Sequence, residues 1–354
     1  MKKKIVVGMS GGVDSSVVAF LLKEQGHEVI GLFMKNWEEK DIHGHCQSTA
    51  EYDDVAKVCD QIGIPYYSVN FVKEYWDLVF SQFLKELKLG YTPNPDILCN
   101  REIKFKLFLE KALELGADLL ATGHYAQIKN GQLLRSVDPD KDQTYFLYTL
   151  QSKILDKVIF PIGHLYKKDL REIARTKKLV TAAKKDSTGI CFIGERNFRN
   201  FLAPYIEYQK GNFETLEGKV VGKHEGVSYY TMGQRKGLRI GGPGEAWFVV
   251  NKDTQRNVVI VQQGSDHPAL YSTDLTATDI SWVNNPPSQI PFYCHAKIRY
   301  RQPDQACLIE KIQDGVMHVH FLNPQRAVTP RQSIVFYDGK RCLGGAMISE
   351  FFQR

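Results

Sequence analysis

Apolar and polar residues follow two alternating patterns along the first half of the chain. Short, nearly continuous apolar runs, typical of buried strands, alternate with segments whose apolar residues recur every three or four positions, as in helices. The runs are residues 4–7, 28–34, 66–70 and 118–122. The helical segments are residues 14–25, 49–62, 73–89 and 102–115. This alternation predicts βαβ units and therefore a parallel sheet covered by helices.

The ends of these strands indicate where a ligand site is expected. In parallel sheets ligands bind beyond the carboxyl ends of the strands. A glycine-rich stretch follows the first run, Met34 ends the second, and Gly123 and His124 follow the fourth. We therefore expect these residues to converge on one crevice.

The pattern changes after about residue 200, where short β-type runs separated by turn residues replace the helical spacing. These runs are residues 247–250, 258–262, 293–300, 316–321 and 333–337. They predict a small β-rich central domain followed by a C-terminal β-barrel. The expected domains are residues 1–199 for catalysis, 200–275 for the central domain and 276–354 for the barrel.

Composition and charge are those of an ordinary globular protein. The chain has 354 residues, 43% of them hydrophobic and 24% charged, which is enough to bury several cores. The net charge is +6, and residues 276–354 hold nine Lys and Arg against six Asp and Glu. This excess permits a polyanionic partner without requiring one. No apolar stretch of 18 residues occurs, so we expect no membrane span.

The seven cysteines are odd in number, scattered and without a C-x-x-C pair. This spacing argues against a secreted disulfide framework and against a zinc or iron–sulfur site, so no metal site is expected. It indicates a reducing compartment, and we expect a cytoplasmic protein.

The stretch GMSGGVDSS, from Gly8 to Ser16, follows the first strand and opens a helix. Unpaired N–H groups and the helix dipole make such a position an anion site. The stretch lacks the lysine of G-x-x-x-x-G-K-[ST] and is not G-x-G-x-x-G, so it belongs to neither common phosphate motif. The alternative interpretation is a helix cap with a tight turn.

The stretch TPNPDILCNREIKF, residues 92–105, contains the first candidate for sulfur chemistry. Two prolines bracket Asn94 and predict a rigid loop, with a helix beginning near Glu102. Cys99 would precede that helix, where the dipole lowers a thiol pKa. Asp96, three residues away, could act as a general acid or base. A cysteine buried in the core is the alternative.

A second cysteine stands in the polar stretch KDSTGICFIGERNF, where Cys191 follows a predicted turn at Thr188 and Gly189. Of two such thiols, one could carry a nucleophilic sulfur and the other could resolve it by thiol–disulfide exchange. Two basic stretches, residues 226–242 and 297–302, could meet phosphates or stack on bases. Solvated strand faces are the alternative for these stretches.

Together with LFMKNW, ATGHYA, DQTYFLY and YTMGQRKGLRIGG, these motifs resemble the bacterial tRNA-specific 2-thiouridylases, a family of PP-loop ATP pyrophosphatases. The resemblance runs from Lys4 to the C-terminus. It implies a Rossmann-like N-terminal domain of the adenine nucleotide α-hydrolase type. It also implies ATP-dependent 2-thiolation of the wobble uridine, position 34, in tRNAs for lysine, glutamate and glutamine. ATP with Mg²⁺ and a persulfide from a donor protein, either a cysteine desulfurase or a sulfur-relay carrier, would be required.

The resemblance also implies roles for individual residues. ATP would be bound by Gly8, Met9, Ser10, Gly11, Gly12, Val13, Asp14, Ser15, Met34 and Gly123. The target base would face Asn94, Pro95 and Asp96, with Asp96 as acid or base. The tRNA would contact His124, Lys141, Asp142, Gln143, Tyr300, Arg301 and Gln332. Cys191 would carry the persulfide, and Cys99 would end up disulfide-linked to it.

One residue departs from the family pattern, and two other classes of protein remain open. Arg239 stands in GLRIGG where the family usually has glycine, which costs about 1 kcal/mol if that turn needs a positive φ. Another PP-loop enzyme that adenylates a different carbonyl, such as an amidotransferase-like synthetase or a lysidine-type ligase, would need no cysteine pair. A non-catalytic nucleotide- or RNA-binding module would bind ATP without releasing pyrophosphate.

Overall fold

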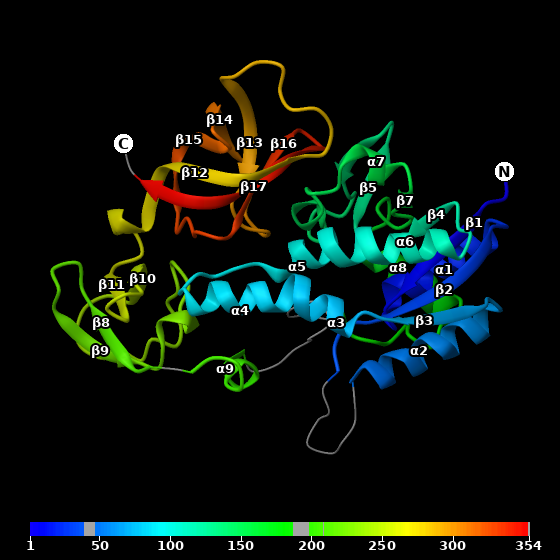
Figure 1. Ribbon diagram of the computed structural model, residues 1–354, viewed down its shortest axis with the longest axis horizontal. Helices are drawn as coiled ribbons and strands as arrows, with labels where there is room; N and C mark the ends of the chain where they lie inside the picture. The colour runs from blue at the N-terminus through cyan, green and yellow to red at the C-terminus, as the bar shows by residue number, and fades with distance from the viewer. Residues whose placement is uncertain (39–46, 187–197, 208, 353–354) are drawn as a thin grey trace.

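The computed structural model describes residues 1–38, 47–186, 198–207 and 209–352, arranged in three parts with a sheet each (Figure 1). The α/β part lies on the right of Figure 1, a small β-rich part at the lower left and a β-barrel at the top. This architecture confirms the predicted fold class of an N-terminal parallel α/β domain, a β-rich central domain and a C-terminal barrel.

The N-terminal sheet has five parallel strands in the order β3-β2-β1-β4-β7. These are β1 (Lys4–Met9), β2 (Glu28–Lys35), β3 (Tyr66–Asn70), β4 (Leu119–Ala121) and β7 (Val158–Ile159). The first four match the predicted runs, whereas the two-residue β7 is too short to leave a pattern. The strand order reverses between β1 and β4, and ligands bind at such a switch point.

The two faces of this sheet are covered by different helices. Successive side chains of β1 point to opposite faces, so Ile5 and Val7 join one core and Val6 the other. The first core lies under α1 (Val13–Glu24), α2 (Gln47–Ile62) and α8 (Lys167–Thr176). Because β1 is buried on both faces, its sequence is a continuous apolar run and does not alternate.

The second face is covered by a long, partly π-helical layer. Its segments are α3 (Val72–Tyr75), η1 (Trp76–Phe80), α4 (Ser81–Lys88), α5 (Pro95–Leu98), η2 (Cys99–Leu107) and α6 (Phe108–Glu114). The predicted helix start near Glu102 is wrong, because the helix begins at Pro95. The Asn94 side chain caps this helix by accepting a hydrogen bond from the Asp96 N–H at 3.1 Å. Pro95 favours the first helical position because its ring holds φ near the helical value. Cys99 therefore lies inside the helix and not before it.

The remaining helices of the described chain are short. They are η3 (Thr144–Phe146), α7 (Ser152–Leu155), α9 (Phe198–Leu202), η4 (Val227–Tyr229) and η5 (Pro268–Leu270). Within the ranges that the structure describes, we find no helix with the length and apolar character needed to cross a membrane.

The central domain is a four-stranded sheet in the order β10-β11-β8-β9. Its strands are β8 (Gly211–Glu214), β9 (Val220–His224), β10 (Trp247–Asp253) and β11 (Val258–Gln263). Alternate residues of β10 and β11, including Val249, Val259 and Val261, are fully buried around Phe213. This small core explains the apolar runs seen in the sequence.

The C-terminal barrel has six strands in the order β12-β15-β14-β13-β16-β17, closed by pairing of β12 with β17. They are β12 (Tyr271–Trp282), β13 (Phe292–Lys297), β14 (Gln305–Gln313), β15 (Val316–Arg326), β16 (Ser333–Asp338) and β17 (Arg341–Phe352). Closure pairs every barrel strand on both sides and so removes exposed sheet edges.

A hairpin of the α/β domain joins the barrel sheet. It consists of β5 (Ala126–Lys129) and β6 (Gln132–Arg135), and β6 pairs with β17. The Arg135 guanidinium contacts both carboxylate oxygens of Asp304 at 2.8 and 2.9 Å and stacks 3.7 Å from the Tyr337 ring centroid. The barrel is therefore joined to the α/β domain by strand pairing, a bidentate ion pair and aromatic packing.

Candidate active site

The glycine-rich loop connects β1 to α1 at the switch point of the sheet. Gly11 has a φ of +70°, and a Cβ added there would lie 2.7 Å from the backbone oxygen of Glu51. Only glycine fits, both for conformation and for space. Gly12 stands at the N-cap of α1 and has no side chain with which to cap it, so the first N–H groups of the helix remain available to an anion.

Hydroxyl groups fix the shape of this loop. The Ser15 hydroxyl accepts from the Ser10 N–H at 3.2 Å and lies 3.2 Å from the Gly12 carbonyl oxygen. The Ser16 hydroxyl donates to the same carbonyl at 2.8 Å. The serines are therefore part of the loop's own framework, which the sequence alone did not reveal.

Gly123 packs directly against the start of α1. A Cβ at Gly123 would lie 3.1 Å from both the Cβ of Asp14 and the N of Ser15. The predicted convergence of the loop with the end of β4 is thus confirmed. Met34 is buried at the carboxyl end of β2, next to β1 in the sheet.

Asp14 is held by two residues that were not among the predicted site residues. The Lys167 ammonium donates to both Asp14 carboxylate oxygens at 2.7 and 2.8 Å, and the Tyr125 hydroxyl donates to one of them at 3.1 Å. Lys167 is the first residue of α8 and its side chain is only 11% exposed. The same ammonium reaches a carboxylate oxygen of Asp186 at 2.8 Å.

Asp186 gathers three cations at the edge of the loop. Lys141 and Arg171 contact it at 2.8 and 2.5 Å, in addition to Lys167. Partial burial acts to raise the pKa of Asp186, but the hydrogen bonds and charges of Lys141 and Lys167 outweigh it, so the pKa lies below its usual value. The cluster of Asp14, Asp186 and the three cations carries one net positive charge next to the anion site.

The predicted persulfide carrier, Cys191, lies outside the described residues, as do its neighbours at 187–197. Asp186 is the last described residue before it in the sequence. The disulfide between Cys191 and Cys99 that the family resemblance implies therefore remains a prediction.

The other predicted thiol is buried. Cys99 is 0% exposed and belongs to the core beneath the helical layer. Asp96 lies one helical turn before it, so both residues share a face of the helix that begins at Pro95. The expectation that Cys99 benefits from a helix N-terminus at Glu102 fails with that helix boundary.

The predicted tRNA contacts near β4 are mostly engaged within the protein. The His124 Nδ1 lies 2.7 Å from the Thr122 hydroxyl, and its ring packs against Phe105 and Phe160. Burial, with the nearby charge of Lys104, lowers the pKa of His124 well below its usual value, so its ring is neutral at pH 7.

Lys141, Asp142 and Gln143 lie in the turn that follows the β5–β6 hairpin. Asp142 is buried and accepts from the Ser136 N–H at 3.1 Å and the Thr144 hydroxyl at 2.8 Å; burial raises its pKa. The Gln143 side-chain oxygen accepts from a backbone N–H at 2.8 Å. These contacts show that the Asp142 and Gln143 side chains order the turn, whereas the Lys141 side chain contacts Asp186.

The barrel residues among the predicted tRNA contacts lie at its boundary with the α/β domain. The Tyr300 ring packs 4.6 Å from that of Phe146, next to the turn that carries Gln143. The Gln332 side-chain amide donates to the Thr92 carbonyl oxygen. Arg301 is exposed. The structure thus brings Tyr300 close to the 141–146 turn and Gln332 to Thr92, two residues before the predicted target-base residue Asn94.

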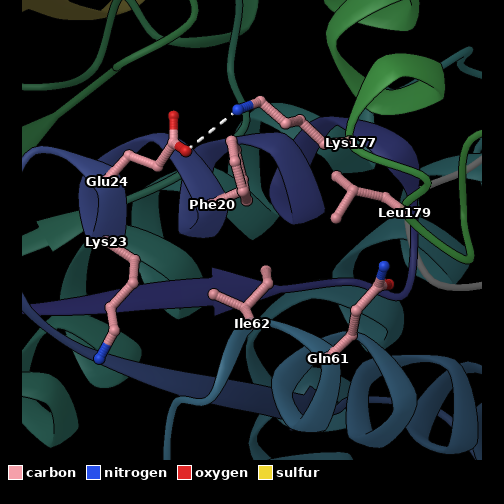
Figure 2. Close-up of a pocket in the computed structure, with 7 residues that line it drawn as sticks. All are labelled: Phe20, Lys23, Glu24, Gln61, Ile62, Lys177 and Leu179. Atoms are coloured by element: carbon pink, nitrogen blue, oxygen red, sulfur yellow. Dashed lines mark hydrogen bonds and ion pairs between the residues drawn. The ribbon is translucent and has the colours of Figure 1, made fainter.

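A separate pocket of about 350 Å³ opens at the opposite end of α1 (Figure 2). An apolar floor of Phe20, Ile62 and Leu179 is rimmed by the ion pair of Glu24 with Lys177 at 3.1 Å. The pocket lies at the C-terminal end of α1, far along the helix from the glycine loop. It contains none of the predicted site residues.

The parallel sheet, the glycine loop at its switch point and the uncapped start of α1 define the class of Rossmann-like α/β domains with an anion site at the first strand–helix turn. Family models match the chain in three consecutive parts: the tRNA methyl transferase HUP domain over residues 3–195, the tRNA methyl transferase PRC-barrel domain over 199–263 and the aminomethyltransferase β-barrel domain over 272–348.

Full-length relatives give the family a more specific description. The tRNA-specific 2-thiouridylase MnmA of Protochlamydia amoebophila is 63% identical over 99% of this chain and 94% of its own length. Those of Geobacillus thermodenitrificans and Alkaliphilus oremlandii are each 58% identical over 99% of this chain and 95% and 98% of their own lengths. The chain belongs to the tRNA-specific 2-thiouridylase family.

Proposed function

We propose that this protein is a tRNA-uridine 2-sulfurtransferase that replaces the 2-oxygen of uridine 34 with sulfur in tRNAs for lysine, glutamate and glutamine. The observation that carries the proposal is the meeting of the anion-binding loop with Gly123 at the sheet's switch point, in a chain 58–63% identical over its length to 2-thiouridylases. Two of the matching family models are described as tRNA methyl transferase domains, so methyl transfer is the competing possibility. The product of the reaction, 2-thiouridine or a methylated nucleoside, decides between the two activities.

The first stage would be adenylation of the uracil. Its 2-oxygen attacks the α-phosphorus of ATP, a new C–O–P linkage forms, and the bond to the β-phosphate breaks so that pyrophosphate leaves. The residues proposed to hold ATP are the loop Gly8–Ser15 with Met34 and Gly123. The free N–H groups at the start of α1 would stabilise charge on the departing pyrophosphate. Asp96, which we propose faces the base, would accept the proton that the uracil gives up.

Magnesium would accompany ATP at this loop. Asp14 is the only carboxylate within residues 8–16, and Mg²⁺ prefers carboxylate and phosphate oxygens, so Asp14 fits as its protein ligand. When bound, the ion would neutralise phosphate charge. Lys167 donates to both Asp14 carboxylate oxygens and balances their charge.

The second stage would deliver sulfur. The terminal sulfur of a Cys191 persulfide attacks carbon 2, and the C–O bond breaks to release AMP. Cys99 then attacks the Cys191 sulfur, so that the S–S bond breaks, the sulfur stays on the base and a Cys99–Cys191 disulfide forms. In the other possible order, Cys99 first frees sulfide, which attacks carbon 2. In both cases an external thiol reductant must restore the two thiols.

The partners follow from this chemistry. The tRNA would contact Lys141, Asp142 and Gln143, together with His124, Tyr300, Arg301 and Gln332. A cysteine desulfurase or a sulfur-relay protein would load Cys191. We place the reaction in the cytoplasm, where a reductant for the thiols is available.

The test is a sulfur-transfer assay with unmodified glutamate tRNA, ATP, Mg²⁺ and a cysteine desulfurase that takes persulfide sulfur from radiolabelled cysteine, followed by digestion to nucleosides. We expect 2-thiouridine and AMP from the wild type, and loss of 2-thiouridine in Cys99→Ser and Cys191→Ser. The control is Cys59→Ala, which alters another fully buried cysteine of the same domain, on α2. AMP without sulfur transfer would indicate another adenylating enzyme, and ATP binding without AMP would indicate a binding module.

A further inference from the structure

The segment between α4 and α5 leads directly into the predicted target-base residues, and the central domain packs against its start. The Ser228 hydroxyl donates to the Leu87 carbonyl oxygen at 2.6 Å. A Cβ at Gly90, whose φ is +79°, would lie 2.2 Å from the Thr254 side chain. The Thr254 side chain therefore packs directly on the Gly90 backbone, in space that any other residue at position 90 would need for its Cβ.

Within this segment, Thr92 also contacts the central domain. Its hydroxyl lies 3.4 Å from the Thr231 hydroxyl and 3.5 Å from the Lys252 ammonium. The same ammonium donates to the Tyr230 carbonyl oxygen at 2.8 Å. Burial lowers the pKa of Lys252 to about 8, which reflects how far the amine is removed from water at this junction.

The barrel also contacts this segment, at Thr92 and at the preceding residue, Tyr91. The Gln332 amide donates to the Thr92 carbonyl oxygen, and the Arg331 guanidinium stacks 5.1 Å from the Tyr91 ring centroid. Arg331 has a φ of +69°, and its N–H donates to the Ile348 carbonyl oxygen at 2.9 Å. The turn that presents both side chains is therefore fixed within the barrel.

A shift at Thr92 would pass directly to the predicted target-base residues. Pro93 and Pro95 restrict the backbone on both sides of Asn94, and the Asn94 side chain caps the helix that carries Asp96 and Cys99. Few freely rotating bonds separate Thr92 from Asp96, so the two move together.

We propose that Lys252 of the central domain and Gln332 of the barrel are positioning residues for the thiolation reaction, acting through Thr92. They hold the chain before Asn94 so that Asp96 meets the target base in the reactive geometry. A side-chain amide has two N–H donors, so Gln332 can keep its hydrogen bond to the Thr92 carbonyl oxygen while its second N–H donates to RNA. The inference rests on the proposed function for the role of Asp96.

The test uses the full-length protein and two measurements, only one of which needs activity. The first is hydrogen exchange of the 91–99 amides in the RNA-free protein, followed by mass spectrometry. The second is kcat for 2-thiouridine at saturating tRNA, beside the Kd for tRNA. We expect Lys252→Met to speed exchange in 91–99 and to lower kcat about tenfold while the Kd changes less than twofold, since small misplacements of reacting groups cost large factors in rate.

Matched variants separate positioning from loss of folding. Thr92→Val removes only the hydroxyl and should reproduce the Lys252→Met effects, whereas Thr92→Ser keeps the hydroxyl and should retain wild-type exchange and kcat. Gln332→Met should speed exchange as well. The exposed residues Lys219 and Gln313, changed to Met in the same two domains, are controls that should leave both measurements unchanged.

Two results would overturn the inference. One is exchange in 91–99 that matches the controls in Lys252→Met and Thr92→Val. The other is faster exchange with an unchanged kcat, which would make the junction structural only. If the wild type makes no 2-thiouridine, the proposed function fails, and the exchange data still decide whether the two domains hold this segment.

Discussion

Lys167 contacts both carboxylate oxygens of Asp14, at 2.7 and 2.8 Å, although the two residues are 153 positions apart in the sequence. The pair ties the start of α8 to the start of α1, directly beside the glycine loop. It also explains how a carboxylate can stand at an anion site, because its charge is balanced before the nucleotide arrives.

We expect Lys167→Met to destabilise the protein by about 2 kcal/mol, because Asp14 and Asp186 would lose the partly buried cation that they share. Urea unfolding measures this change. Lys177→Met is the control, since its pair with Glu24 is exposed at the surface and contributes less than about 1 kcal/mol. Equal losses in the two variants would contradict the role given to Lys167.

Gly11→Ala should abolish measurable ATP binding in titration calorimetry. The added methyl group would meet the Glu51 carbonyl oxygen at 2.7 Å in a backbone conformation that alanine disfavours, so the loop must move. Gly26→Ala is a matched control: its φ is +83°, but nothing lies within 4 Å of the added carbon. It should lose about 1 kcal/mol of stability and keep its ATP affinity.

The left-handed conformation at Arg239 predicts a stabilising substitution. The residue is exposed with a φ of +56°. Arg239→Gly removes about 1–2 kcal/mol of backbone strain. The greater freedom of glycine in the unfolded chain offsets about 0.5–1 kcal/mol of this gain. Thermal unfolding should therefore show a small net gain, whereas Arg235→Gly in the same loop should lose stability. A loss in both variants would refute the strain argument.

The buried ring of His124 predicts a pH dependence of folding. Its folded pKa lies below the unfolded value near 6.5, so below that pH the unfolded chain binds more protons. The free energy of unfolding should rise as pH increases from about 5 to 6.5, and this contribution should be complete above 6.5.

The slope should be reduced in His124→Phe, which keeps an aromatic ring between Phe105 and Phe160. His164→Phe is the control because that residue is exposed. Identical pH profiles for wild type and His124→Phe would show that the ring titrates normally.

Local sequence patterns predicted the elements well because each depends on nearby residues. The continuous run at β1 predicts a strand buried on both faces, and the loop after it predicts an anion site. The helix start at Pro95 was predictable too, since Asn94 and Pro95 form a cap signal. The two prolines around Asn94, however, predict a rigid loop and therefore a later helix start.

Long-range contacts left no such signal. The pairing of β6 with β17 joins Leu134 to Arg341, and nothing near residue 134 indicates a partner so far along the chain. Lys167 stands in no recognised motif, and Asp186 begins the cysteine-containing stretch without any sign of its partners. Packing of α8 against α1 brings Lys167 to the loop, and Lys167 and Arg171 of α8 contact Asp186. The hydrogen bond from Gln332 to Thr92 likewise forms only because the barrel packs against the segment that contains Thr92.

The most direct test of the account is an isotope measurement on the oxygen that leaves the base. The substrate is glutamate tRNA carrying ¹⁸O at the 2-position of uridine 34, and the AMP released by wild-type protein is analysed by mass spectrometry. The account predicts one ¹⁸O in the phosphate of AMP for each 2-thiouridine formed, because the 2-oxygen attacks the α-phosphorus. Unlabelled AMP alongside 2-thiouridine would contradict adenylation of that oxygen.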